Sequence, residues 1–179
     1  MPAMRRPRTV LSVLAAVALA LAVALLSSGG SSAAPSKSQE LFRKTLLADE
    51  RTTSAIKDLL RTGGGIVAPD ITFADLTGDG RSDAIVLVDT GGVAGAVALY
   101  VFSTHGEDED ADLRAVYRSQ RLYRASAEVS DAALTLTTPR FAAGDDVCCP
   151  AKVVRRVYTW STGARTLRLR DTDEVDGPG

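Results

Sequence analysis

Two continuous apolar runs constrain the fold of this 179-residue chain more than any other feature. Residues 84–88 and residues 96–102 contain no charged residue, and Gly91, Gly92 and Gly95 lie between them. Short apolar runs bounded by glycine are typical of strands that are covered by protein on both faces and joined by a hairpin loop. The sequence therefore predicts a central hairpin that is covered by other parts of the protein on both of its faces.

The later part of the chain alternates apolar and polar residues, which is typical of strands with one face in a core. Leu113, Ala115 and Tyr117 fall on one side of such a strand, whereas Arg114 and Arg118 fall on the other. The same alternation recurs toward the C-terminus and, with the central hairpin, gives about eight strands joined by short turns. We expect these strands to form a mainly antiparallel sheet.

A helix is predicted before the strands, over residues 39–61. Ser36 and Gln39 fit a capping box at its start, and apolar residues recur at helical spacing through the segment. A polar run at residues 49–53 interrupts this stripe, so one helix or two short helices both fit. We expect the helical segment to pack on one face of the sheet, which makes the fold class α+β.

Residues 1–34 have the order of a secretory signal. Three arginines come first, a 17-residue apolar stretch broken by one serine follows, and small residues lead to Ala33, after which we expect cleavage. This length is also the lower limit for a membrane-spanning helix, so a retained N-terminal anchor is the alternative. Both alternatives predict a protein that is secreted or held on the extracytoplasmic face of the membrane.

The remaining chain is expected to form one globular domain over residues 35–170 and an acidic, disordered tail over residues 171–179. Its charge is uneven: residues 70–112 carry ten acidic residues and one basic, whereas residues 113–170 carry eleven basic and four acidic. The arginines either line the solvent-facing side of the sheet or bind an anionic wall or membrane polymer. A net charge of −1 argues against a nucleic-acid partner.

The segment at residues 75–83, DLTGDGRSD, indicates metal chemistry. Calcium takes six to eight oxygen ligands, and a short loop supplies them at alternate positions around a glycine. The candidate ligands are the side chains of Asp75, Thr77, Asp79 and Asp83 and the carbonyl oxygen of Arg81. The alternative is a turn without a metal, because Asp, Gly and Thr favour tight turns by themselves.

The longer segment FADLTGDGRSDAIVLV, residues 73–88, resembles the calcium loop of FG-GAP and VCBS repeats, in which D-x-[ND]-x-D-G-x-x-D joins two strands. Thr77 stands at position 3, where those loops have an amide or a carboxylate. The motif occurs once, so no propeller of repeats is inferred. A calcium ion in this loop would have a structural role and hold two central strands together.

Cys148 and Cys149 are adjacent in the sequence and, in an exported protein, are expected to meet an oxidising environment. Three states remain open: a disulfide between the two neighbours, a pair of reduced thiols beside a turn, or, as the third, either pairing with another molecule or a redox role. One histidine and two cysteines are too few for a conventional zinc site.

The order of signal, short helix, D-L-T-G hairpin, G-D turn and aromatic C-terminal strand resembles small exported proteins and lipoproteins of Gram-positive actinobacteria. The similarity is greatest to the Cse-type lipoprotein of a cell-envelope stress system. The segments that carry it are ADLTGDGRSDAIV, LYVF, AAGDDVCCPA and VYTW. The lipid-bearing cysteine of those lipoproteins is missing. The resemblance implies an accessory or regulatory role outside the cytoplasm, without catalysis.

These observations predict an exported, non-enzymatic binding or regulatory protein of the cell envelope. Its partner is expected to be an envelope protein or an anionic cell-wall polymer. His105, the single histidine, lies in an expected hairpin loop beside an acidic run at residues 107–110, where a solvated surface role is expected. The alternative is a secreted hydrolase with an acidic site that the sequence does not identify; the carboxylates of Asp75, Asp79 and Asp83 are crowded into one turn, which favours a cation over a pair for glycan hydrolysis.

Overall fold

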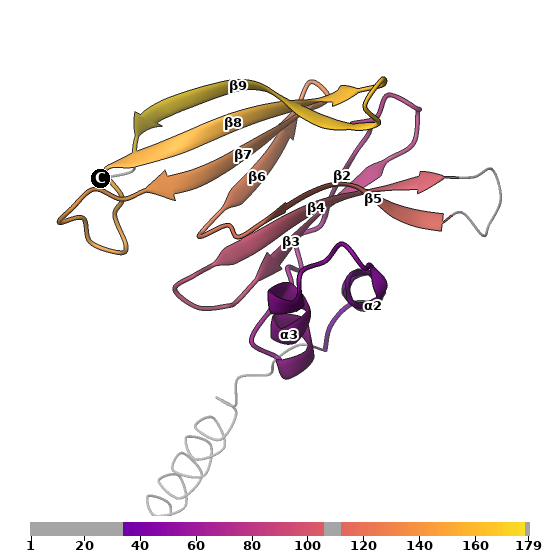
Figure 1. The fold of residues 1–179 in the computed structure, drawn as a ribbon, viewed down its shortest axis with the longest axis horizontal. Helices are drawn as coiled ribbons and strands as arrows, with labels where there is room; N and C mark the ends of the chain where they lie inside the picture. The colour runs from indigo at the N-terminus through magenta and orange to yellow at the C-terminus, as the bar shows by residue number, and fades with distance from the viewer. Residues whose placement is uncertain (1–33, 106–111, 178–179) are drawn as a thin grey trace, which may run out of the picture. The chain divides into compact units, whose positions relative to one another are not determined.

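The computed structural model describes residues 34–105 and 112–177, and the chain from Pro35 onward forms one compact unit. Two helices, α2 (Lys37–Ala48) and α3 (Ser54–Thr62), precede nine strands in the described part of the chain (Figure 1). The predicted signal lies outside the described residues, except for Ala34. Among those described, no helix has the length and apolar character needed to span a membrane.

The helical segment forms two helices, which is the second of the alternatives left open by the sequence. The hydroxyl of Ser36 accepts a hydrogen bond from the backbone N–H of Gln39 at 3.2 Å, and the side-chain oxygen of Gln39 accepts one from Ser36 at 2.8 Å. This confirms the capping box at the start of α2. Gly63 ends α3 with a φ of 78°, in the left-handed region that glycine adopts readily.

The strands form two antiparallel sheets, whereas the alternation in the sequence predicts one. The first sheet contains β1 (Ile66–Val67), β2 (Thr72–Ala74), β3 (Asp83–Asp89), β4 (Ala96–His105) and β5 (Asp112–Gln120). The second contains β6 (Ser126–Ser130), β7 (Ala133–Arg140), β8 (Lys152–Ser161) and β9 (Thr166–Asp176), paired in chain order. β3 and β4 pair with each other, and β5 lies at the edge beside β4. The α+β class is confirmed.

The helices, the first sheet and the second sheet lie in three layers (Figure 1). Alternate residues of β3 and β4 point to opposite faces. Val86 and Tyr100 are buried against the helices, whereas Ile85 and Leu99 are buried in the core shared with the second sheet. The central hairpin is therefore covered on both faces, as its apolar runs predict. The helices cover one face only, so the other face requires the second sheet.

β5 departs from regular alternation at Val116. Val101 of β4 pairs with Tyr117 and Phe102 pairs with Ala115, so Val116 is left between them as a β-bulge. Ala115 packs against the helix-side core, whereas Tyr117 packs in the core between the sheets. The expectation that these two residues share a face is therefore wrong, because the extra residue reverses the side-chain directions that follow it.

The bulge also changes the placement of two arginines. Arg114 and Arg118 are predicted on one face of β5, but their neighbours Ala115 and Tyr117 face opposite cores. Because side chains alternate along a strand, Arg114 and Arg118 leave β5 on opposite faces. Arg118 lies on the helix side, where its guanidinium contacts Asp49. Both arginines therefore flank the edge of the first sheet.

The prediction of a disordered acidic tail over residues 171–179 is wrong for residues 171–176, which belong to β9. Acidic residues of β9 meet basic residues of β7 and β8: Asp176 lies 2.9 Å from Lys152, Glu174 pairs with Arg140, and Asp173 lies opposite Arg155 in register. Opposite charges on neighbouring strands stabilise their pairing. A run of like charge in the sequence does not reveal a partner strand.

The layered core makes a prediction for Leu99, which has no exposed surface and lies between the two sheets. Leu99→Ala should lower the free energy of unfolding by about 2–5 kcal/mol, because it removes buried methyl groups and leaves a cavity. The matched control is Leu169→Ala, at a β9 residue that is 54% exposed, and it should cost less than about 0.5 kcal/mol. Urea unfolding followed by Trp160 fluorescence measures both, and equal losses would contradict this core.

Candidate functional site

The loop between β2 and β3 is a tight turn held by aspartate side chains. The carboxylate of Asp75 accepts hydrogen bonds from the backbone N–H groups of Gly78 and Gly80, at 2.7 and 2.9 Å. The carboxylate of Asp79 accepts one from Arg81 at 2.9 Å. These bonds give the loop a defined shape without a metal ion, as expected for an aspartate-rich turn.

Asp83, the first residue of β3, has no exposed surface. Its Oδ2 atom accepts the backbone N–H groups of Leu76 and Thr77, at 2.8 and 2.9 Å. Its Oδ1 atom is buried and has no hydrogen-bond partner among the described residues, and the same holds for the hydroxyl oxygen of Thr77. A buried polar atom without a partner costs about 1–3 kcal/mol. A cation that reached these two oxygens would remove that cost.

The predicted ligands do not form a ready-made metal centre. In the described part of the chain, no group of three or more His, Cys, Asp or Glu side chains is placed to hold a metal ion. Asp79 and Arg81 are exposed, whereas Asp83 is fully buried. Four of the five predicted ligands lie in the β2–β3 loop and Asp83 begins β3, and calcium binding stays a prediction.

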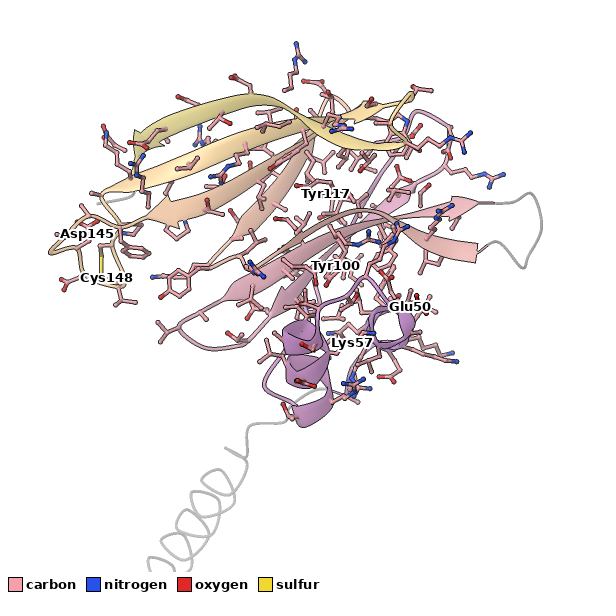
Figure 2. The ribbon with its side chains drawn as sticks, viewed as in Figure 1. Glu50, Lys57, Tyr100, Tyr117, Asp145 and Cys148 are labelled. Atoms are coloured by element: carbon pink, nitrogen blue, oxygen red, sulfur yellow. A yellow bond between two sulfur atoms is a disulfide. The ribbon has the colours of Figure 1, made fainter. Side chains whose placement is uncertain are left out.

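A disulfide bond joins Cys148 to Cys149, which is the first of the three states left open by the sequence. The pair lies in the connection between β7 and β8, near Asp145 (Figure 2). The carboxylate of Asp145 accepts the backbone N–H groups of Ala142 and Ala151, both at 2.8 Å, and so closes this connection. These two hydrogen bonds stabilise the charged form and lower the pKa of Asp145.

A hollow of about 920 Å³ lies over β6–β9, with Cys148 in its lining. Polar residues such as Thr135 and Thr137 line this face, whereas Leu134 and Leu136 point into the core. The hollow has four acidic and two basic residues in its lining. Because the ion pairs of β8 and β9 already use part of this charge, the hollow carries no strong preference for an ion of either sign.

Two adjoining hollows follow the β5 edge of the first sheet, with volumes of about 580 and 660 Å³. They share Arg51, Arg114, Ala115 and Arg118, so they form one groove, which we call the arginine groove. Among the described residues, its lining contains five basic residues, Lys44, Arg51, Arg114, Arg118 and Arg165, and one acidic residue, Asp49. Trp160 adds an apolar surface in one of the two hollows.

The four arginines of the arginine groove come from three segments that are far apart in the sequence: the α2–α3 connection with Arg51, β5 with Arg114 and Arg118, and the β8–β9 turn with Arg165. Two hydrogen bonds hold the outer segments to β5. The amide of Gln120 donates to the carbonyl oxygen of Arg51 at 3.1 Å. The hydroxyl of Thr166 donates to the carbonyl oxygen of Val116, the bulge residue, at 2.7 Å.

Asp49 positions two of the arginines. Its Oδ2 atom lies 3.3 Å from Nη2 of Arg118, and its Oδ1 atom accepts the backbone N–H of Arg51 at 2.9 Å. The side chains of Asp49 and Arg118 are only 21% and 23% exposed. The Nε atom of Arg118 is buried and has no acceptor in the part of the chain that the structure describes. The Nη2 atom also donates to the carbonyl oxygen of Ala115 at 3.3 Å, so two contacts hold the guanidinium of Arg118 in place.

No protein-family model matches the chain. Comparisons with characterised proteins and with solved structures also find no match. The resemblances to the FG-GAP and VCBS calcium loop and to Cse-type lipoproteins therefore stay predictions, and the functional argument rests on the geometry of the groove and the loop.

The sequence does not reveal the arginine groove, because its basic residues do not recur at a regular interval along the chain. Arg51 lies in the polar run that interrupts the helical stripe, and Arg165 lies in a turn. The uneven charge of residues 113–170 was the one available signal, and it does not select a site. His105 is the last residue of β4 and not a loop residue. The acidic run at residues 107–110 lies outside the described residues.

The disulfide makes a prediction that a thiol assay can check. Chain purified from an oxidising compartment and unfolded without reductant should show no reactive thiol, and it should show two after reduction. The Cys148→Ser/Cys149→Ser variant should show none in either condition, which controls for the reagent. Two reactive thiols before reduction would favour the reduced pair and contradict the disulfide.

Proposed function

We propose that the chain is an exported, non-enzymatic binding or regulatory protein of the cell envelope with an anionic partner. The observation that carries the proposal is the arginine groove, where five basic residues face one acidic residue. Arg51, Arg114 and Arg165 are exposed there. Guanidinium groups form strong, charge-assisted hydrogen bonds with anionic oxygens. An envelope protein with an acidic surface or an anionic wall polymer fits this description.

We also propose that the β2–β3 loop holds a structural calcium ion. Asp83 and Thr77 would supply the two buried oxygens that lack partners. The carboxylates of Asp75 and Asp79 accept at most one described hydrogen bond per oxygen, so they retain lone pairs for a cation. The ion would offset the negative charge of the loop and hold β2 beside β3, without taking part in a reaction.

A hydrolase that uses the loop carboxylates is the alternative, and no described contact favours it. Both oxygens of Asp75 accept backbone N–H groups, and Asp83 is fully buried. The linings of the arginine groove and of the hollow over β6–β9 contain no carboxylate of this loop. A general acid or base needs access to a substrate, so these carboxylates are poorly placed for hydrolysis.

Cell fractionation tests export. The chain, expressed with a C-terminal tag in a Gram-positive host, should appear in the medium or on the outer face of the membrane, where added protease cleaves it. A variant that lacks residues 1–34 is the matched control and should stay in the cytoplasm. N-terminal sequencing that begins at Ala34 would identify cleavage, and an uncut N-terminus would identify the anchor. Parent chain found only in the cytoplasm would refute the proposal.

Thermal melting tests the calcium ion. Calcium at roughly a hundredfold excess over its dissociation constant should raise the melting temperature by about 5–10 °C, because it binds the folded state alone. Asp79→Asn should reduce this shift, since it removes an exposed loop carboxylate. Asp70→Asn, at an exposed aspartate outside the loop, should leave the shift unchanged. A melting temperature that does not respond to calcium would exclude the ion.

A further inference from the structure

We infer that the arginine groove binds a phosphodiester polymer of the cell envelope, with successive phosphates held by arginines along the edge of β5. This inference rests on the proposed envelope function and adds the chemistry of the ligand and the place where it binds. It does not depend on calcium in the β2–β3 loop, because no residue of that loop lines the groove.

The distribution of charge along the groove favours a polymer over a small anion. Arg165 lines only the hollow beside the β8–β9 turn, and Lys44 lines only the hollow beside α2. Arg51, Arg114 and Arg118 lie between these ends because they line both hollows. One small anion contacts a few of these groups, whereas a chain with a repeated charge contacts basic residues along the whole groove.

The kind of basic residue favours phosphate. Four of the five basic residues are arginines, whose planar guanidinium presents donors in a fork that matches the oxygens of a phosphate. Arg114 and Arg118 leave β5 on opposite faces because of the bulge at Val116. They therefore approach the edge from two sides. A tetrahedral phosphate has oxygens in several directions and can contact both guanidinium groups, whereas a single guanidinium group can bind both oxygens of a planar carboxylate.

Apolar residues between the charges suit the carbon segments of such a polymer. Leu41 lines one hollow, Trp160 lines the other, and Ala115 lies in both. Leu41 is 53% exposed, although leucine favours burial. A ligand that alternates phosphates with short carbon linkers would cover these apolar surfaces while its phosphates contact the arginines.

Arg118 gives the groove a fixed central donor. Asp49 and the carbonyl oxygen of Ala115 hold its Nη2 atom, and no described group accepts a hydrogen bond from its Nη1 atom. Asp49 also accepts the backbone N–H of Arg51, so one carboxylate holds the guanidinium of Arg118 and the backbone of Arg51. Asp49 is therefore a positioning residue, and no other acidic residue of the described part of the chain lines the groove.

The arginines have a simpler alternative role. β5 is an edge strand, and charged side chains at an edge prevent pairing with the strand of another molecule. If that were their only role, removal of the charges would promote self-association and leave polymer binding unchanged. Size-exclusion chromatography of the variants described next therefore separates the two roles.

The test is titration calorimetry of the purified full chain with poly(glycerol phosphate) at low salt. Arg114→Gln/Arg165→Gln removes two exposed groove arginines and should weaken binding by about tenfold to a hundredfold, as expected for the loss of charged hydrogen bonds. Arg168→Gln/Arg170→Gln is the matched control, because it removes the same charge from exposed β9 residues outside the groove. The control should bind like the parent, and melting temperatures should confirm that both variants are folded.

Two other probes identify the ligand class. Polygalacturonate carries carboxylates at comparable spacing, and it should bind more weakly than poly(glycerol phosphate). Vesicles of phosphatidylglycerol carry the same phosphodiester in a lipid headgroup. Equal binding of the carboxylate polymer would refute phosphate selectivity, and binding to the vesicles alone would refute a polymer ligand.

The remaining outcomes separate this inference from the proposed function. Equal weakening by the two double variants would mean that net charge alone drives binding, which refutes the groove as the site. A parent chain that is exported but does not bind poly(glycerol phosphate) would refute the inference and leave an envelope protein as partner. A chain that stays in the cytoplasm would refute both.

Discussion

The β3–β4 hairpin is apolar on both faces, and the burial of these faces determines where the other elements lie. Val86 and Tyr100 require the two helices on one side, while Ile85 and Leu99 require the second sheet on the other. Each such side chain stabilises the fold by about 1.5–3 kcal/mol when it is fully buried. Loss of either covering layer would expose a whole row of these side chains.

The arginine groove arises where these layers meet, through a polar connection centred on Gln120. Its side-chain oxygen accepts hydrogen bonds from the hydroxyl of Tyr100 at 3.0 Å and from the backbone N–H of Thr53 at 2.8 Å, while its amide donates to Arg51. Burial of the phenol raises the pKa of Tyr100, which keeps it a neutral donor. One glutamine therefore joins the helix connection to β4 and β5.

Local signals in the sequence predict local structure in this chain. The capping box at Ser36, the break between the helices and the aspartate-rich turn each depend on neighbouring residues, and all are present. The division into two sheets, the folding of residues 171–176 into β9 and the formation of the groove all depend on pairing between distant segments. Hydrophobic periodicity carries no information about which strands pair, so Arg51 and Arg165 could not be placed beside β5 in advance.

The bulge at Val116 shows that one extra residue in a strand determines which face the following side chains occupy, whatever the composition of the strand. One residue without a partner in the ladder turns Tyr117 into the core between the sheets and sends Arg114 and Arg118 to opposite faces. A chain of nearly identical composition but without that residue would display both guanidinium groups on a single face of β5. The spacing of charged residues along an edge strand is thus itself a structural parameter, as informative as their identity.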